Sequence, residues 1–421
     1  MNPLTKTDLL SLIALGENSA VEFKRDELRP ESFAKELVAF GNFEGGRLLL
    51  GVEDDGTVSG INYDRHYVWQ LEEWVMTICR TKVQPGIIPF FQLIRDVVPG
   101  RDVAIIQVNR ALQVLHQWHN DRRIYFVRAG TTAAELHPDE LARLFQQRGQ
   151  VRADVQPVPG AALADLDIAR LTDYFHRVRQ QDSPDYADTT GWTQLLLNTE
   201  LMVELRDATT PQPVPVPSVA GLLLFGQNPN RFLPQAGITA ATYPGIEKDY
   251  SAILDRIRGP LVGLFQLTAG GQTELLIPGV IDRALAFVQQ HAADPEQLVG
   301  AVRTEFPHYP PEAVRESLVN AVAHRDYLLG GTDVELALYA DRLEVISPGN
   351  LPNGMTVDRM RAGTRATRNQ LVLDVLKDYR YMEQRGLGVR LKIIPLMRAH
   401  NGTEPDLQAD GDRFTVRLWR G

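Results

Sequence analysis

Three carboxylates near the amino terminus could act on a phosphodiester. Glu17, Glu22 and Asp54 lie in this region, and Lys24 follows Glu22 by two positions. Carboxylates that lie close together repel one another, so a divalent cation such as Mg²⁺ or Mn²⁺ stabilises the cluster. A metal beside a lysine supplies a Lewis acid, an activated water and a positive charge near the reacting oxygen. We therefore take the three acids as candidate metal ligands and, with Lys24, as candidate catalytic residues.

The same residues also have an explanation that involves no chemistry. Residues 54–56 read Asp-Asp-Gly, which is a common sequence for a hairpin turn. Glu22 and Lys24 alternate with apolar residues over 21–24, which is typical of a half-buried strand with one polar face. Taken alone, the acidic residues are weak evidence for a nuclease.

A second group of polar residues recurs at helical spacing in the carboxy-terminal part. Glu316, Asn320 and His324 are four residues apart within Pro311–Asp326, beside an apolar stripe on the same predicted helix. Mg²⁺ takes few protein ligands and keeps waters and phosphates, which suits a single asparagine. The spacing predicts a nucleotide site with Asn320 as metal ligand, Glu316 as catalytic carboxylate and His324 as a cofactor contact.

The pattern of apolar residues predicts an α/β unit over 1–150 that positions the acids. Strands are expected over 21–24, 47–52, 103–108 and 124–127, with a helix over 33–40 between the first two. Farther along, we expect a linker over 156–160, helices over 161–206 and a stiff proline-rich segment over 211–217. Buried strands are expected over 220–226 and 238–243, and a helix over 280–292.

The last part of the chain is expected to form one further unit from about residue 303. A helix over 311–326 precedes strands over 333–339 and 342–346, helices over 370–380 and 388–399, and a closing strand over 414–419. The expected domains are therefore 1–150, a middle connector over 151–302, and 303–421.

Composition limits the class of protein. The 421 residues are 44% hydrophobic and 23% charged, which is typical of a globular protein rather than a disordered one. Cys79 is the single cysteine, which excludes a disulfide framework and favours a reducing compartment, so we expect a cytoplasmic protein. The net charge of −9 argues against a generally basic nucleic-acid coat, although it permits a local basic groove. We expect no membrane span and no signal peptide, because Leu9–Leu15 is too short and follows Asp8.

Two smaller features have structural interpretations. His116 and His119 flank Trp118 and could suggest a metal pair, but no third ligand lies nearby in the sequence, so we expect a polar loop. Cys79 stands among apolar residues, which predicts a buried small side chain.

The amino-terminal segments 16–24, 39–46 and 50–54 resemble the Schlafen/AlbA-type nucleic-acid-binding domain, and 125–132 is similar to that family's Y-x-R-x-G-S/T segment. In the branch with nuclease activity, metal-binding acids occupy two glutamates five residues apart and the aspartate of G-V-x-D. These positions match Glu17, Glu22 and Asp54. The resemblance implies nucleic-acid binding, with Lys24, Arg25 and Arg128 as phosphate contacts. Many bacterial relatives are described only as DNA binders or regulators, so both activities stay open.

The segment Pro311–Asp326 resembles the N-box of the gyrase, histidine-kinase and heat-shock chaperone ATPases. The resemblance implies a divergent Bergerat-type α/β sandwich in which Asn320 ligates Mg²⁺ and Glu316 activates water. Gly386 and Gly388 resemble the family's later glycine box, and residues 363–369 correspond to its lid. Ser347 stands where an adenine-reading aspartate is expected, just before Gly349, so we expect weak discrimination between bases.

Together these features predict a mixed α/β protein with an AlbA/Schlafen-like domain, a connector and an ATPase-like domain. The expected function is nucleic-acid binding with metal-dependent cleavage, conditioned by ATP or another nucleotide in a homo-oligomer, most simply a dimer. One alternative is a non-enzymatic DNA-binding transcriptional regulator with a nucleotide-sensing domain. Another is an ATPase that is tethered to nucleic acid.

Overall fold

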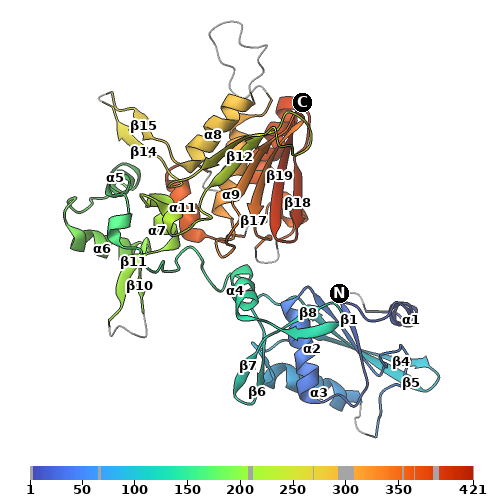
Figure 1. The fold of residues 1–421 in the computed structure, drawn as a ribbon. Coiled ribbons are helices and arrows are strands. Elements are labelled where there is room, and N and C mark those ends of the chain that lie inside the picture. The colour runs from blue at the N-terminus through green and yellow to red at the C-terminus, as the bar shows by residue number, and fades with distance from the viewer. Residues whose placement is uncertain are drawn as a thin grey trace. The chain divides into compact units, whose positions relative to one another are not determined.

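The chain folds into two compact units, Met1–Gln150 and Val151–Gly421 (Figure 1). The computed structural model describes residues 3–64, 68–206, 212–268, 270–292, 308–352, 355–364, 366–382 and 388–420. Gly386, expected in the glycine box, and Arg365, expected in the lid, lie outside the described residues.

The first unit is a mixed α/β fold. Its elements are α1 (Lys6–Ala14), β1 (Val21–Lys24), α2 (Pro30–Asn42), β2 (Gly45–Leu50), α3 (Val68–Thr81), β3 (Val83–Gln84), β4 (Phe90–Val98), β5 (Arg101–Asn109), β6 (His116–His119), β7 (Arg122–Ile124), β8 (Phe126–Ala129), β9 (Thr132–Glu135) and α4 (Pro138–Gln147).

A four-stranded sheet with the order β1-β2-β5-β4 organises this unit. Strand β1 runs parallel to β2, and the other neighbours are antiparallel. Side chains alternate between its two faces, as strand geometry requires. Leu48 and Leu50 of β2 pack in the core formed with α2 and α3, whereas Leu49 packs with Val21 and Phe23 in the core formed with α1. Glu22 and Lys24 therefore lie on the α2 face, and they share one face of the strand, as the alternation predicted.

The second unit is also mixed α/β. Its elements are η1 (Leu163–Asp165), α5 (Ile168–Asp173), η2 (Tyr174–Val178), α6 (Thr189–Asn198), β10 (Met202–Leu205), β11 (Val214–Pro217), α7 (Val219–Phe225), η3 (Pro229–Arg231), β12 (Ile238–Thr242), β13 (Ile253–Ile257), β14 (Leu264–Leu267), β15 (Thr273–Ile277), α8 (Val280–His291), α9 (Pro311–Ala323), β16 (Val334–Leu338), β17 (Arg342–Pro348), α10 (Val357–Arg361), α11 (Gln370–Asp378), η5 (Val389–Ile393), α12 (Ile394–Asn401), β18 (Asp406–Asp410) and β19 (Arg413–Trp419).

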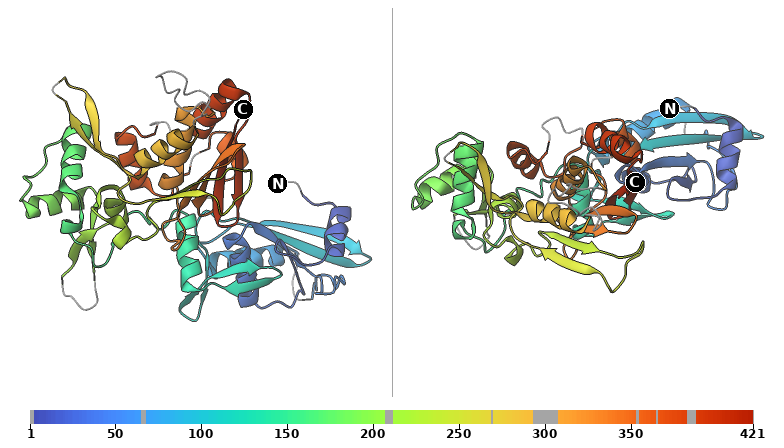
Figure 2. Two further views of the ribbon diagram at one scale, coloured as in Figure 1. Left: turned by 45° about the horizontal axis from the view of Figure 1, so that its top comes forward. Right: turned by 90° about the horizontal axis from the view of Figure 1, so that it is seen from above.

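A six-stranded sheet with the order β13-β12-β16-β17-β19-β18 forms the body of this unit, and α8 and α9 pack against it (Figures 1 and 2). Strand β12 runs parallel to β16. Strands β12 and β13 belong to the expected connector, and β16 to β19 belong to the expected ATPase-like domain. One sheet thus takes strands from both sides of residue 302.

The prediction of a strand over 220–226 is wrong, because α7 occupies Val219–Phe225. Ser218 caps this helix by accepting a hydrogen bond from the Gly221 amide, and the residues from Ala220 to Phe225 are all buried. Gly221 is required there, because a Cβ atom would lie 2.1 Å from the Leu201 carbonyl oxygen. A fully apolar run does not distinguish a buried strand from a buried helix.

Two other expectations also need correction. The end of the segment expected to be helical forms strand β10, and the proline-rich segment supplies β11, which pairs antiparallel with β10. Residues His116–His119 form strand β6 rather than a loop. Cys79 is buried, as predicted. No helix among the described residues is long and apolar enough to cross a membrane.

Candidate functional site

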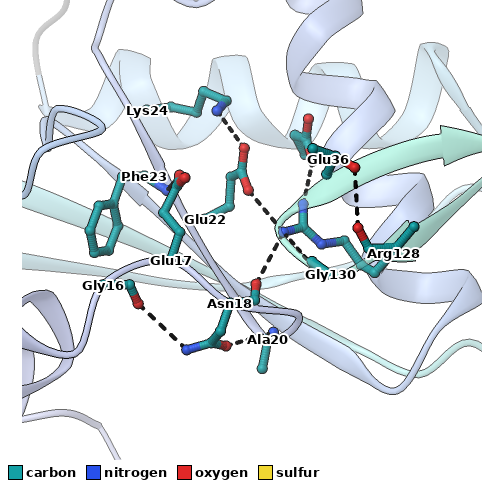
Figure 3. Close-up of polar contacts among 12 residues, drawn as sticks. Gly16, Glu17, Asn18, Ala20, Glu22, Phe23, Lys24, Glu36, Arg128 and Gly130 are labelled. Carbon is teal, nitrogen blue, oxygen red and sulfur yellow. Dashed lines mark hydrogen bonds and ion pairs between the residues drawn. The ribbon is translucent and has the colours of Figure 1, made fainter.

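Two glutamates of the first unit bind a buried arginine (Figure 3). Arg128 of β8 forms ion pairs with Glu22 of β1 at 2.9 Å and with Glu36 of α2 at 2.8 Å. Its guanidinium also donates hydrogen bonds to the backbone oxygens of Asn18 and Gly130. The Arg128 side chain is 0% exposed. These contacts place Arg128 inside the fold rather than on a phosphate-binding surface.

Neighbouring carboxylates affect the pKa values of two glutamates in this region. Burial raises the pKa of Glu36, and the charge of Glu22 raises it further against the opposing effect of Arg128. Burial also raises the pKa of Glu17, and the charges of Glu22 and Asp54 add to that rise. The charges of Glu22 and Asp54 therefore both act on Glu17.

Each of these acids also has its own local environment. Glu17 accepts a hydrogen bond from the Phe23 amide at 2.8 Å, and Lys24 forms an ion pair with Glu22. Burial lowers the pKa of Lys24, but the hydrogen bond and charge of Glu22 outweigh it, so the net pKa is raised. Asp54 is exposed in the turn after β2.

The three acids do not fit a divalent metal in this arrangement. Glu22 is already neutralised by two cations, Arg128 and Lys24. Within the ranges that the structure describes, no group of three or more Asp, Glu, His or Cys side chains is placed to hold a metal ion. Arg25, the remaining phosphate-contact candidate, forms an ion pair with Glu53.

The residues predicted to bind a nucleotide gather around a cavity of about 260 Å³ in the second unit. Helix α9 begins with Pro311 in its first turn, which a helix tolerates because that amide has no intrahelical partner. Its apolar stripe is buried in the core, which leaves the polar stripe facing the cavity. The expected residues that line the cavity are Glu316, Asn320, His324, Ser347, Gly349 and Gly388.

Glu316 and Asn320 form the polar centre of this wall. The Asn320 amide nitrogen donates to Glu316 Oε1 at 3.1 Å, which leaves the amide oxygen without a donor among the described residues. Gly388 lies directly against the same carboxylate, because a Cβ atom there would be 1.7 Å from Glu316 Oε1. An amide oxygen one helical turn from an oriented carboxylate fits a nucleotide-bound Mg²⁺, which takes few ligands from a protein.

His324 and Ser347 differ in what they can offer a ligand. Burial lowers the pKa of His324 to about 4, with Arg368 and Lys377 adding to the effect, so the imidazole is neutral. Its Nδ1 atom is buried and has no hydrogen-bond partner among the described residues. The Ser347 hydroxyl instead donates to the Ala321 carbonyl at 2.8 Å. Ser347 is therefore poorly placed to read a base.

The expected lid residues divide into two groups. Gly363 and Thr364 line the cavity. Arg368 and Asn369 are buried, and both bind the end of α9: Arg368 donates to the His324 carbonyl at 2.9 Å, and Asn369 donates to those of Ala323 and Arg325. These two side chains hold α9 and α11 together.

Sequence reasoning missed two cations of the cavity wall, Lys377 of α11 and Arg390 of η5. It also missed an apolar part of the wall, which is formed by Val345, Leu351, Met355, Met360, Leu373 and Met382. No spacing marks these residues, because they come from separate elements that meet only in the folded unit.

Two family models match the chain. Residues 17–137 match the model described as "Schlafen, AlbA_2". Residues 331–418 match the model described as "Putative ATP-dependent DNA helicase recG C-terminal". The first range contains all the acidic-cluster residues, and the second contains Ser347, Gly349 and Gly388 but begins after α9. The comparison with curated proteins finds no match.

Two solved structures are similar to parts of the chain. The DIP2311 protein from Corynebacterium diphtheriae is 20% identical over 96% of this chain, with a TM-score of 0.41, and the match spans 65% of that protein's chain. The N-terminal domain of a protein from Nitrosomonas europaea, titled "Putative ATP-dependent DNA Helicase RecG-related Protein", is 26% identical over 26% of this chain and 75% of that domain, with a TM-score of 0.21. The family matches confirm the expected combination: the chain carries an amino-terminal region of the Schlafen AlbA_2 type and a carboxy-terminal, ATPase-like region of the recG C-terminal type.

Proposed function

We propose that this protein binds a nucleotide in the cavity of the second unit and nucleic acid through the first unit. We further propose that bound nucleotide changes the affinity for nucleic acid. The observation that supports the nucleotide part is the convergence of Glu316, Asn320, His324 and Gly388 on one cavity. The descriptions of the matched families, which name a Schlafen domain and an ATP-dependent DNA helicase, support nucleic acid as the partner.

The cavity offers different surfaces to the two ends of a nucleotide. Asn320 would hold Mg²⁺ through its amide oxygen, and the metal would neutralise phosphate charge. Lys377 and Arg390 supply further positive charge at the wall. The apolar side chains Met355, Met360 and Leu373 provide a surface for a base. Glu316, oriented by Asn320, is placed to hold a water molecule, so hydrolysis is a further part of the proposal.

Thermal unfolding of the full chain with ATP, GTP and Mg²⁺ tests the nucleotide part. A ligand at one hundred times its dissociation constant stabilises the folded state by about 2.7 kcal/mol. Asn320→Ala should lose this stabilisation, while Glu316→Ala should retain it and abolish any hydrolysis. Asn198→Ala, on helix α6 and outside the cavity wall, is the matched control and should behave like the parent. Stabilisation that is equal in the parent and in Asn320→Ala would contradict the assigned site.

Metal-dependent cleavage by Glu17, Glu22 and Asp54 is the second candidate function. It is favoured by one observation: the charges of Glu22 and Asp54 add to the rise that burial causes in the pKa of Glu17. The ion pair between Glu22 and Arg128 opposes it, and we derive no step through a metal. Incubation of labelled single-stranded, duplex and hairpin substrates with Mn²⁺ or with a chelator tests it. Cleavage that requires Mn²⁺ and is lost in Asp54→Ala would establish this candidate.

The oligomeric state is part of the same proposal. A nucleotide-induced dimer, as the resemblance to the chaperone-type ATPases implies, would bring two first units onto one nucleic acid and raise affinity through avidity. Light scattering with and without ATP should then show a shift from one chain to two. One unchanged mass in both conditions would contradict it.

A further inference from the structure

A short β-hairpin in the first unit presents two exposed arginines that form no ion pair with a carboxylate among the described residues. Strands β6 and β7 are joined by Asn120 and Asp121, whose φ angles of 49° and 57° give the tight turn preferred in two-residue hairpins. The register places Trp118 opposite Arg123 and His119 opposite Arg122. Strand β7 is the outer strand of the sheet β3-β6-β7 (Figure 1).

One face of this hairpin combines an aromatic ring with a positive charge. Gln117 is buried and donates to the Glu31 carbonyl at 2.8 Å, so its neighbours His116 and Trp118 point to the opposite face. Arg123 lies across from Trp118 and projects from that same face. Arg122, which is paired with His119, projects from the other face. We name the surface formed by Trp118 and Arg123 the hairpin surface.

Packing of aromatic rings holds the start of strand β6 in place, whereas the indole ring of Trp118 is available to a ligand. His116 packs on Tyr125 with ring centroids 5.4 Å apart, and Tyr125 packs edge-on against Phe145 at 5.8 Å. Trp118 is partly exposed, and within the part of the chain that the structure describes its indole makes no ring contact and its Nε1 atom has no acceptor. A ring held on a paired strand can accept another flat ring without reordering the chain.

The two hairpin arginines, of which Arg123 belongs to the hairpin surface, differ from the cations predicted by sequence. Lys24, Arg25 and Arg128 are all paired with glutamates. Arg122 and Arg123 are exposed, and neither has a carboxylate within 4.0 Å among the described residues. Unpaired arginines lose no internal ion pair when they bind an anion, which makes them better phosphate contacts than the paired ones.

We propose that the hairpin surface binds single-stranded nucleic acid, with an unpaired base stacked on Trp118 and a flanking phosphate bound by Arg123. This inference rests on the proposed function and names the site in the first unit that would serve it. Stacking on an aromatic ring requires a base that is free of a duplex, and it tolerates any base because each has a π face. An acidic peptide would use the arginine but not the ring.

Fluorescence anisotropy of the full chain with labelled oligothymidylate and with a duplex of the same length tests this inference. Trp118→Ala should weaken single-strand binding at least about five-fold, and Trp118→Phe should retain most of it. The variant Arg123→Ala should reduce the slope of log affinity against log salt by about 0.7, which corresponds to one phosphate. Arg95→Ala is the matched control, because Arg95 is an exposed arginine on β4, an outer strand of the four-stranded sheet in this unit.

The outcomes separate this inference from the broader proposal. If the parent binds nucleic acid and both hairpin variants bind as tightly, with unchanged melting temperatures, the hairpin surface is the wrong site and nucleic-acid binding stands. Preference for the duplex, or equal loss in Arg95→Ala, also overturns the inference. If the parent binds no oligonucleotide at low salt, both the inference and the nucleic-acid part of the proposed function fail. Should Trp118→Ala not fold, Trp118→Phe and Arg123→Ala still decide the question.

Discussion

The Nη2 atom of Arg128 lies 2.9 Å from the Oε2 atom of Glu22, and both side chains are almost fully buried. Sequence reasoning assigned one of these residues to phosphate and the other to a metal. In the folded unit they neutralise each other, and Glu36 completes the pairing on the other side of the guanidinium. Arg128 also lies over the Phe40 ring at 4.8 Å, which adds a cation–π contact. The network joins β1, α2 and β8.

Arg128→Ala should therefore reduce the stability of the first unit strongly. Removing one partner of a buried ion pair leaves an uncompensated charge and costs about 3–5 kcal/mol. Arg25→Ala removes a cation whose side chain is 72% exposed, so it should cost about 1 kcal/mol or less. Urea unfolding of the full chain measures both. Equal, small losses of stability in the two variants would show that Arg128 acts at a surface instead.

Gly388→Ala should disrupt the cavity wall without any backbone strain. Gly388 has a helical φ of −54°, but an added Cβ atom would lie 1.7 Å from the Glu316 carboxylate oxygen. Either Glu316 or the start of η5 must move, so we expect at least a ten-fold loss of nucleotide affinity. Gly245→Ala is the control, because a Cβ atom there would have no heavy atom within 4 Å. Calorimetric titration with Mg·ATP measures the difference, and equal affinity in the two variants would place the nucleotide elsewhere.

His324 should make the second unit less stable in mild acid. Its pKa is lowered from 6.5 to about 4, so the unfolded chain binds a proton that the folded chain does not. The stability linked to this residue is complete above pH 6.5 and is lost as the pH falls toward 4, by at most about 3 kcal/mol. The variant His324→Gln should show a flatter decrease of melting temperature over this pH range. An identical decrease in parent and variant would assign the acid sensitivity to other groups.

The periodic parts of the fold could be predicted from sequence because they depend on local alternation. Burial of Val21 and Phe23 fixes the face of Glu22, and the apolar stripe of α9 fixes the face of Asn320. The run Ala220–Phe225 shows no alternation of apolar and polar residues, because all its residues are buried in α7. The one signal that favoured a helix there was Ser218 directly before the apolar run, because serine is a preferred residue at a helix N-cap.

Long-range pairing could not be predicted in the same way. Nothing near Glu22 in the sequence shows that Arg128 will reach it, because that pairing depends on how β8 packs on α2. The hairpin surface was also missed, although the aromatic residue and the adjacent arginines are visible in the sequence. The signal that would have found it is the Asn-Asp pair between two strand-like segments, which predicts the tight turn and hence the pairing of Trp118 with Arg123.

The last prediction concerns how nucleotide in the second unit could change binding by the first. Asp154 is fully buried near the start of the second unit, and its Oδ2 atom accepts a hydrogen bond from the Leu371 amide at 2.6 Å. This bond caps the first turn of α11, and Leu373 and Lys377 of the same helix line the cavity. A nucleotide that shifts α11 must therefore act on the segment that directly follows the first unit in sequence.

We expect nucleotide to change nucleic-acid affinity by about 1–3 kcal/mol in the parent, the usual scale of coupling between two sites, with the reciprocal effect on nucleotide affinity. Asp154→Ala should reduce this coupling to less than two-fold while nucleotide still binds, because the cap on α11 is lost. Asp154→Asn keeps an acceptor oxygen for the Leu371 amide and should retain the coupling. Paired titrations of each variant, with melting temperatures as the folding control, measure these effects. Full coupling in Asp154→Ala would show that the signal does not pass through this contact, and an absence of coupling in the parent would leave the two units as independent binding modules.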